Sequence, residues 1–63
     1  MSAYTTMKKL IDTLSRKYES GRIDEGAYAV TAETYKKRID VFYANGRLSD
    51  EEYSELMGDF KSF

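Results

Sequence analysis

One eleven-residue stretch occurs twice in the chain: residues 18–28 read YESGRIDEGAY, and residues 43–53 read YANGRLSDEEY. The two copies share both tyrosines, the glycine and the arginine. Each copy has the order of a helix end, a turn and a helix start, because Gly21 and Gly46 can take the positive φ that commonly ends a helix. The repeat therefore predicts three helices joined by two similar turns.

The residues that follow each glycine are suited to begin a helix. Asp24 and Ser49 are residue types that accept a hydrogen bond from the free N–H groups of a first helical turn. Glu52, three residues after Ser49, completes the pattern of a capping box. An apolar residue before each cap and a tyrosine four residues after it form the pattern of a hydrophobic staple. The staple pairs are Ile23 with Tyr28 and Leu48 with Tyr53.

Apolar residues recur at alternating spacings of three and four, which is the period of a helix. The three series are Tyr4, Met7, Ile11, Leu14 and Tyr18; Tyr28, Ala32, Tyr35, Ile39 and Phe42; and Tyr53, Leu56, Phe60 and Phe63. They predict helices near residues 4–20, 25–44 and 50–61. Connections this short turn successive helices antiparallel. The expected fold is all-α: an up-down-up three-helix bundle, one domain over residues 1–63, built from two helical hairpins that share the middle helix.

Composition limits both the supports of this fold and its chemistry. The 63 residues include no cysteine and no histidine, so neither a disulfide nor an ordinary zinc site is expected. Nucleophilic catalysis needs an activated nucleophile and a base, and no serine lies in a glycine-rich elbow. Phosphate-loop and calcium-loop spacings are also absent from the sequence. We therefore expect no enzyme, no cofactor and no metal.

Four carboxylates share one side of the third predicted helix: Glu51, Glu52, Glu55 and Asp59. Like charges four residues apart repel by roughly 0.2–0.5 kcal/mol in an isolated helix, which calls for a stabilising positive group. One candidate is the Lys9/Arg16 face of the first helix, and another is a basic partner protein. A third interpretation is a solvated acidic surface that keeps the protein in solution. The four carboxylates are thus candidate partner-binding residues.

Two valines form a second candidate site. Val30 and Val41 are eleven residues apart, hence at nearly the same angle on the middle helix and roughly 200° from the side that carries Tyr28 and Ile39. A three-helix bundle leaves this back side at least partly outside the core. Single exposed valines are ordinary. Two in register on a chain this small, with no disulfide or metal, make Val30 and Val41 candidate residues of a homodimer contact.

Nucleic-acid binding is an alternative, because short helical hairpins can place a helix in a groove. The net charge of −1 counts against it. The run Lys36-Lys37-Arg38 adds little, since successive side chains point about 100° apart around a helix. A second alternative is an acidic decoy, in which the carboxylate stripe occupies the nucleic-acid-binding surface of a host enzyme.

Residues 42–58, FYANGRLSDEEYSELMG, resemble the XkdX family of short phage and prophage proteins. The shared pattern is an aromatic residue, tyrosine, glycine, a hydrophobic residue, Ser or Thr, glutamate and tyrosine, with a glycine soon after. The segment is also similar to the short C-terminal helical module of many bacterial proteins. The family pattern usually includes a tryptophan, which this chain lacks, and the first repeat departs from it at Asp24 and Ala27. The resemblance implies a phage-encoded, non-enzymatic protein.

No run of 18 apolar residues and no signal-peptide core occur in the sequence, so we expect neither secretion nor a membrane span. The lack of cysteine fits a reducing compartment. We expect a protein of the host cytoplasm or of a phage particle. The leading hypothesis is a small helical protein-interaction module that binds another protein or itself.

Overall fold

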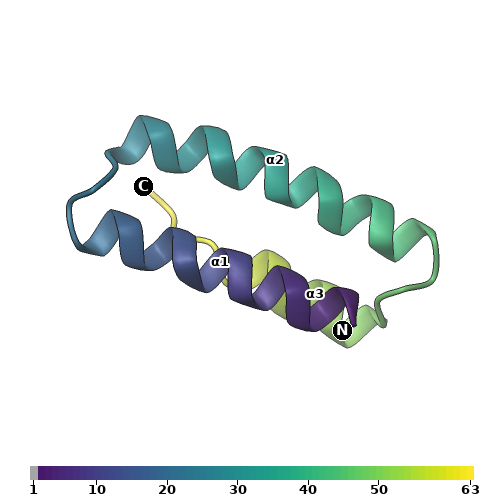
Figure 1. Ribbon diagram of the computed structural model, residues 1–63. Helices are drawn as coiled ribbons and strands as arrows, with labels where there is room; N and C mark the ends of the chain where they lie inside the picture. The colour runs from purple at the N-terminus through teal and green to yellow at the C-terminus, as the bar shows by residue number, and fades with distance from the viewer. Residues whose placement is uncertain (1) are drawn as a thin grey trace.

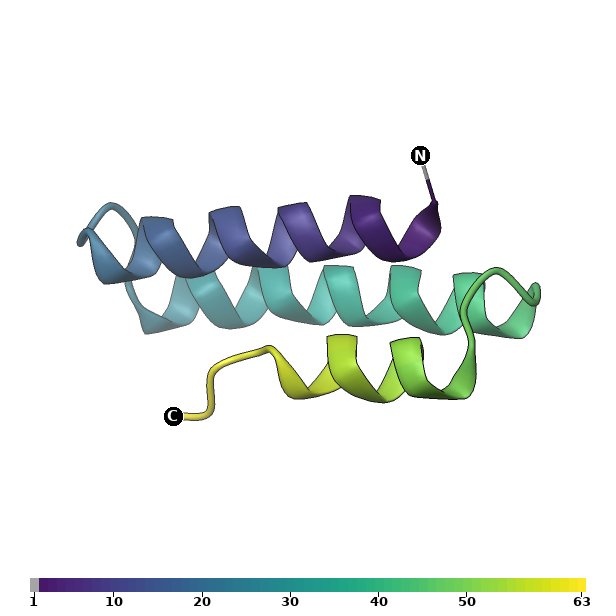
Figure 2. The same cartoon turned by 90° about the horizontal axis from the view of Figure 1, so that it is seen from below.

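The computed structural model describes residues 2–63, which form three helices: α1 (Ala3–Glu19), α2 (Glu25–Ala44) and α3 (Asp50–Gly58). Within the described residues there is no strand. Consecutive helices run antiparallel, and α1 and α3 both lie on the same side of α2 (Figure 1, Figure 2). The expected all-α three-helix bundle is confirmed.

Both glycine turns form, and their backbones are nearly identical. Gly21 and Gly46 take φ angles of +80° and +73°. In each turn the arginine after the glycine donates its backbone N–H to the carbonyl five residues earlier, at 2.9 Å in the first turn and 2.8 Å in the second. This bond across the helix end is that of a Schellman motif. The repeated sequence thus produces the same local structure twice.

The predicted caps begin α2 and α3. Asp24 accepts a hydrogen bond from the N–H of Ala27 at 2.8 Å. Ser49 accepts one from the N–H of Glu52 at 3.1 Å, and the Glu52 carboxylate accepts one from the N–H of Ser49 at 2.9 Å. The capping box is therefore complete. α2 begins and ends at the predicted residues, and α1 is displaced from its predicted bounds by one residue.

Two clusters of buried apolar side chains fill the bundle. The larger cluster is shared by α1, α2, α3 and the second turn and contains Met7, Ile11, Ile39, Leu48 and Leu56. The smaller cluster lies between α1 and α2 and contains Leu14, Tyr28 and Ala32. All eight side chains are at most 5% exposed. Each hydrophobic staple belongs to one of these clusters, so each turn is anchored to the core.

α3 is shorter than predicted, ending at Gly58 instead of near residue 61. Glycine is a poor helix former, and the chain continues beyond it as a non-helical tail, residues 59–63, that runs toward the α1–α2 turn (Figure 1, Figure 2). The prediction that Phe60 and Phe63 continue the apolar side of a third helix is therefore wrong.

The tail closes the end of the bundle that α3 does not reach. The backbone N–H of Lys61 donates to the Tyr28 hydroxyl at 2.8 Å. The Phe63 ring meets those of Tyr18 and Tyr28 edge-on, with centroids 5.0 and 5.3 Å away. Tyr28 is consequently only 1% exposed.

Candidate interaction surfaces

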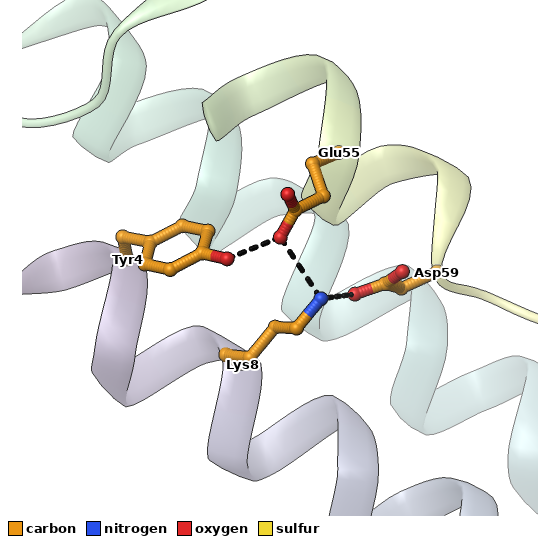
Figure 3. A network of polar contacts seen from close by, with 4 residues as sticks. All are labelled: Tyr4, Lys8, Glu55 and Asp59. Atoms are coloured by element: carbon orange, nitrogen blue, oxygen red, sulfur yellow. Dashed lines mark hydrogen bonds and ion pairs between the residues drawn. The ribbon is translucent and has the colours of Figure 1, made fainter. Parts of the chain in front are cut away.

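The acidic side of α3 is largely occupied by contacts with α1. The Lys8 Nζ atom lies 2.9 Å from Glu55 Oε2 and 2.6 Å from Asp59 Oδ2. The Tyr4 hydroxyl donates to the same Glu55 oxygen. Figure 3 shows the lysine reaching from α1 between the two carboxylates. A single cation thus offsets the repulsion between Glu55 and Asp59.

These contacts shift the proton affinities of the groups involved. The hydrogen bond from Tyr4, followed by the one from Lys8, lowers the pKa of Glu55 below its ordinary value. The bonds to Asp59 and Glu55 raise the pKa of Lys8, and the bond to Glu55 raises the pKa of Tyr4. The side chains of Lys8 and Glu55 remain 44% and 48% exposed, so this is a surface network that salt screens.

α1 supplies the expected positive group, but the residue differs from the prediction. Arg16 pairs with Asp12 on its own helix at 3.0 Å, and Lys9 is exposed. The reason is helical phase: relative to the buried Met7, Lys8 is rotated by about 100° and Lys9 by about 200°. Lys8 therefore lies at the edge that faces α3, whereas Lys9 and Arg16 lie on the far side. The prediction that they face the acidic stripe is wrong.

The other two predicted partner-binding carboxylates lie at the start of α3. Glu52 is held in the capping box by the N–H of Ser49. Glu51 is exposed and forms no hydrogen bond or ion pair with another described residue. Of the four carboxylates, Glu51 is therefore the one without a hydrogen bond or ion pair to a described residue.

Two tyrosines meet at the second turn, a contact that was not predicted from the sequence. The rings of Tyr43 and Tyr53 lie 4.4 Å apart between centroids, with their planes at 32°. The Tyr43 hydroxyl donates to Asp50 at 2.5 Å, and the Tyr53 hydroxyl donates to Asp40 at 2.7 Å. These bonds raise the pKa of both tyrosines. The sequence repeat could have indicated this contact, since both tyrosines occur in each copy. The corresponding rings of the first turn, Tyr18 and Tyr28, also meet, with centroids 5.6 Å apart.

The side of α2 opposite the core is uncovered, and it carries both candidate valines. Because α1 and α3 lie on the other side of α2 (Figure 1), Val30 is 71% exposed and Val41 is 58% exposed. The helical rise places them about 16.5 Å apart along the helix. We call this surface the outer face of α2. It consists of the exposed residues Ala27, Val30, Glu33, Thr34, Lys37, Val41 and Ala44.

Two shallow hollows of about 450 Å³ each follow one another along the outer face. Thr34 and Lys37 line both of them, and each hollow contains one of the two valines. Glu33 and Lys37 form no ion pair with a described residue, although they are placed beside the valines. The outer face thus combines exposed methyl groups with unpaired charges of both signs.

No family model matches this chain, and neither a curated protein nor a solved structure shows significant similarity to it. Among residues 2–63, no group of three or more carboxylates is placed to hold a metal ion. None of the helices in the described part of the chain has the length and apolar character needed to cross a membrane.

Proposed function

We propose that this protein is a small, non-enzymatic protein-interaction module that binds through the outer face of α2. The observation that carries the proposal is the exposure of Val30 and Val41. Within α1–α3 they are the only large apolar side chains more than half exposed, and they lie in line on one helix side. Burying such a side releases water from apolar surface, which is the main favourable term in most protein association.

The acidic side of α3 supports a binding role less well. A decoy of nucleic acid, or a site for a basic partner, needs carboxylates that are free to bind. Lys8 already contacts Glu55 and Asp59, and Glu52 caps its own helix. A partner would have to displace these contacts before it gained new ones. These internal contacts favour the outer face of α2 over the carboxylate stripe.

The proposal includes a phage or prophage origin and a place of action in the host cytoplasm or the phage particle. It rests on the resemblance of residues 42–58 to the XkdX family. In this segment the glycine turn and the capping box account for most of the shared pattern. The resemblance thus lies in residues that shape the second hairpin, and the outer face of α2 lies outside most of it.

Affinity capture tests the proposed use of the outer face. The tagged chain would be immobilised and exposed to a lysate of its host that also contains the untagged chain. We expect a retained protein, either a host protein or the untagged copy, that the Val30→Glu/Val41→Glu variant retains at least tenfold less.

The matched control is Lys9→Ala/Thr13→Glu, which changes the net charge equally at exposed positions of α1. This control should retain the protein as the parent does. Equal retention by the parent, the control and the Val30→Glu/Val41→Glu variant would contradict the proposal.

A further inference from the structure

We infer that the occupant of the outer face is a second copy of this chain, docked as an antiparallel α2–α2 pair about a twofold axis. The inference rests on the proposed use of this face and names the partner. A twofold contact requires a self-complementary surface. When the axis passes between Tyr35 and Lys36, Val30 of each copy lies opposite Val41 of the other.

The register that pairs the valines also overlaps the helices almost completely. Residues 27–44 of one copy lie along residues 44–27 of the other, so only the first two residues of α2 (Glu25–Ala44) extend past the contact. Ala27 then lies opposite Ala44 at each end. Small side chains at both ends let the helix axes approach closely. The same register therefore pairs the valines with each other and places small side chains opposite each other at both helix ends.

The charges of the outer face fit the same register. Glu33 and Lys37 lie on the same flank of the outer face, at angles about 40° apart around α2. In the antiparallel pair, Glu33 comes within about one residue, roughly 1.5 Å, of the axial position of Lys37 from the other copy. The twofold axis repeats this pair, so two ion pairs lie between the two valine contacts. A parallel in-register pair would set Lys37 directly against Lys37 and Glu33 against Glu33, whereas the antiparallel pair separates the two lysines by about 4.5 Å along the axis and places a glutamate beside each.

The size of the contact predicts a weak dimer. The overlapping segment is about 26 Å long, and a helix with its side chains is about 10 Å wide. The contact area on each copy is therefore about 260 Å², well below the roughly 800 Å² per partner of a standard stable interface. We therefore expect a dissociation constant in the micromolar range, which makes association dependent on local concentration.

Charge reversal at the two valines tests the partner and the register together. Val30→Glu/Val41→Glu places like charges opposite each other in the dimer, and so does Val30→Lys/Val41→Lys. A one-to-one mixture of the two variants places Glu opposite Lys at both contacts. Because both positions are exposed, each variant should keep the far-UV circular dichroism of the parent. Val30→Ser/Val41→Ser, which adds no charge, serves if a charged variant fails to fold.

Sedimentation equilibrium from micromolar to millimolar concentration supplies the readout. We expect the parent and the Lys9→Ala/Thr13→Glu control to dimerise alike, and each charged variant alone to associate at least tenfold more weakly. The mixture should associate at least tenfold more tightly than either variant. The uncharged serine variant should also associate more weakly than the parent.

Two results would overturn the inference. A parent that stays monomeric over the whole range excludes the second copy as the occupant; capture of a host protein through the same face would then still support the proposed function. A dimer whose strength is unchanged in the variants, or a mixture no tighter than its components, excludes the antiparallel α2–α2 contact.

Discussion

The acidic side of α3 and the outer face of α2 are both exposed, but only the first finds its partners within the chain. Glu55 on α3 and Asp59, the residue that follows the helix, lie 2.9 and 2.6 Å from Lys8. On α2, Val30 and Val41 are 71% and 58% exposed. The carboxylates would lose existing contacts on binding a partner, whereas the valines would lose only water.

This difference separates surface chemistry that serves the fold from surface chemistry that is left for a partner. A stripe of like charges attracts attention in a sequence, yet one lysine on a neighbouring helix is enough to neutralise part of it. An apolar side chain on the uncovered side of a central helix has no such neighbour. The outer face of α2 is therefore the better candidate site, and the comparison can be tested on both helices.

The largest expected change is in the free energy of unfolding, when a buried and an exposed side chain of α2 are each shortened to alanine. Ile39 is fully buried in the larger cluster, so Ile39→Ala should lower the free energy of unfolding by about 2–5 kcal/mol. Such a loss is enough to unfold much of a domain this small. Val41→Ala, two residues further on, should change it by less than about 0.5 kcal/mol.

Urea denaturation followed by far-UV circular dichroism measures both variants, at a protein concentration low enough to keep the chains monomeric. A loss at Val41 as large as that at Ile39 would show that the valine packs inside the monomer, and the contrast between the two sides of α2 would fail.

The next effect concerns the lysine that holds α3. Lys8→Met should lower the urea midpoint, because Glu55 and Asp59 then repel each other without a cation between them. Lys9→Met is the matched control, since Lys9 is exposed and contacts neither carboxylate. High salt should shrink the difference between the two variants. Equal midpoints would mean that the network contributes nothing to the docking of α3.

The smallest effect is a pH dependence at Glu55. Its pKa is lowered in the folded chain, first by the hydrogen bond from Tyr4 and then by Lys8. The contact therefore stabilises the fold above the ordinary pKa of glutamate and is lost as the pH falls through the lowered value. Between about pH 5 and about pH 3, the parent should lose stability more steeply than Tyr4→Phe. Parallel pH profiles would show that the Tyr4 bond does not govern this titration.

The turns and helix starts could be predicted because they depend on residues close together in the sequence. Gly21 and Gly46 take positive φ as expected, and Asp24 and Ser49 cap the helices that follow them. The exposure of the valines was also predictable, because the helical period alone places them on the side of α2 opposite the core. Local chemistry thus determined most of the backbone.

Contacts between distant residues were harder to predict. Helical period alone could have excluded Lys9, which lies about 200° from the apolar side that contains Met7. That Lys8 is the cation that meets Glu55 depends on which edge of α1 faces α3, and a spacing pattern does not define that edge. The fold-back of residues 59–63 depends on where α3 ends, and it buries Tyr28 while its counterpart Tyr53 stays half-buried. Two tyrosines in equivalent positions of the repeat therefore differ in burial for a purely non-local reason.

Valine-methyl NMR tests the central claim, that the outer face of α2 pairs with itself, most directly. Val30 and Val41 are the only valines in the chain, so selective labelling reports on this face alone. Within one chain they are about 16.5 Å apart along α2, too far for a nuclear Overhauser effect, whereas the antiparallel pair brings them into contact. We predict a Val30–Val41 methyl cross-peak that grows with protein concentration. Its absence at concentrations where the protein sediments as a dimer would contradict the account.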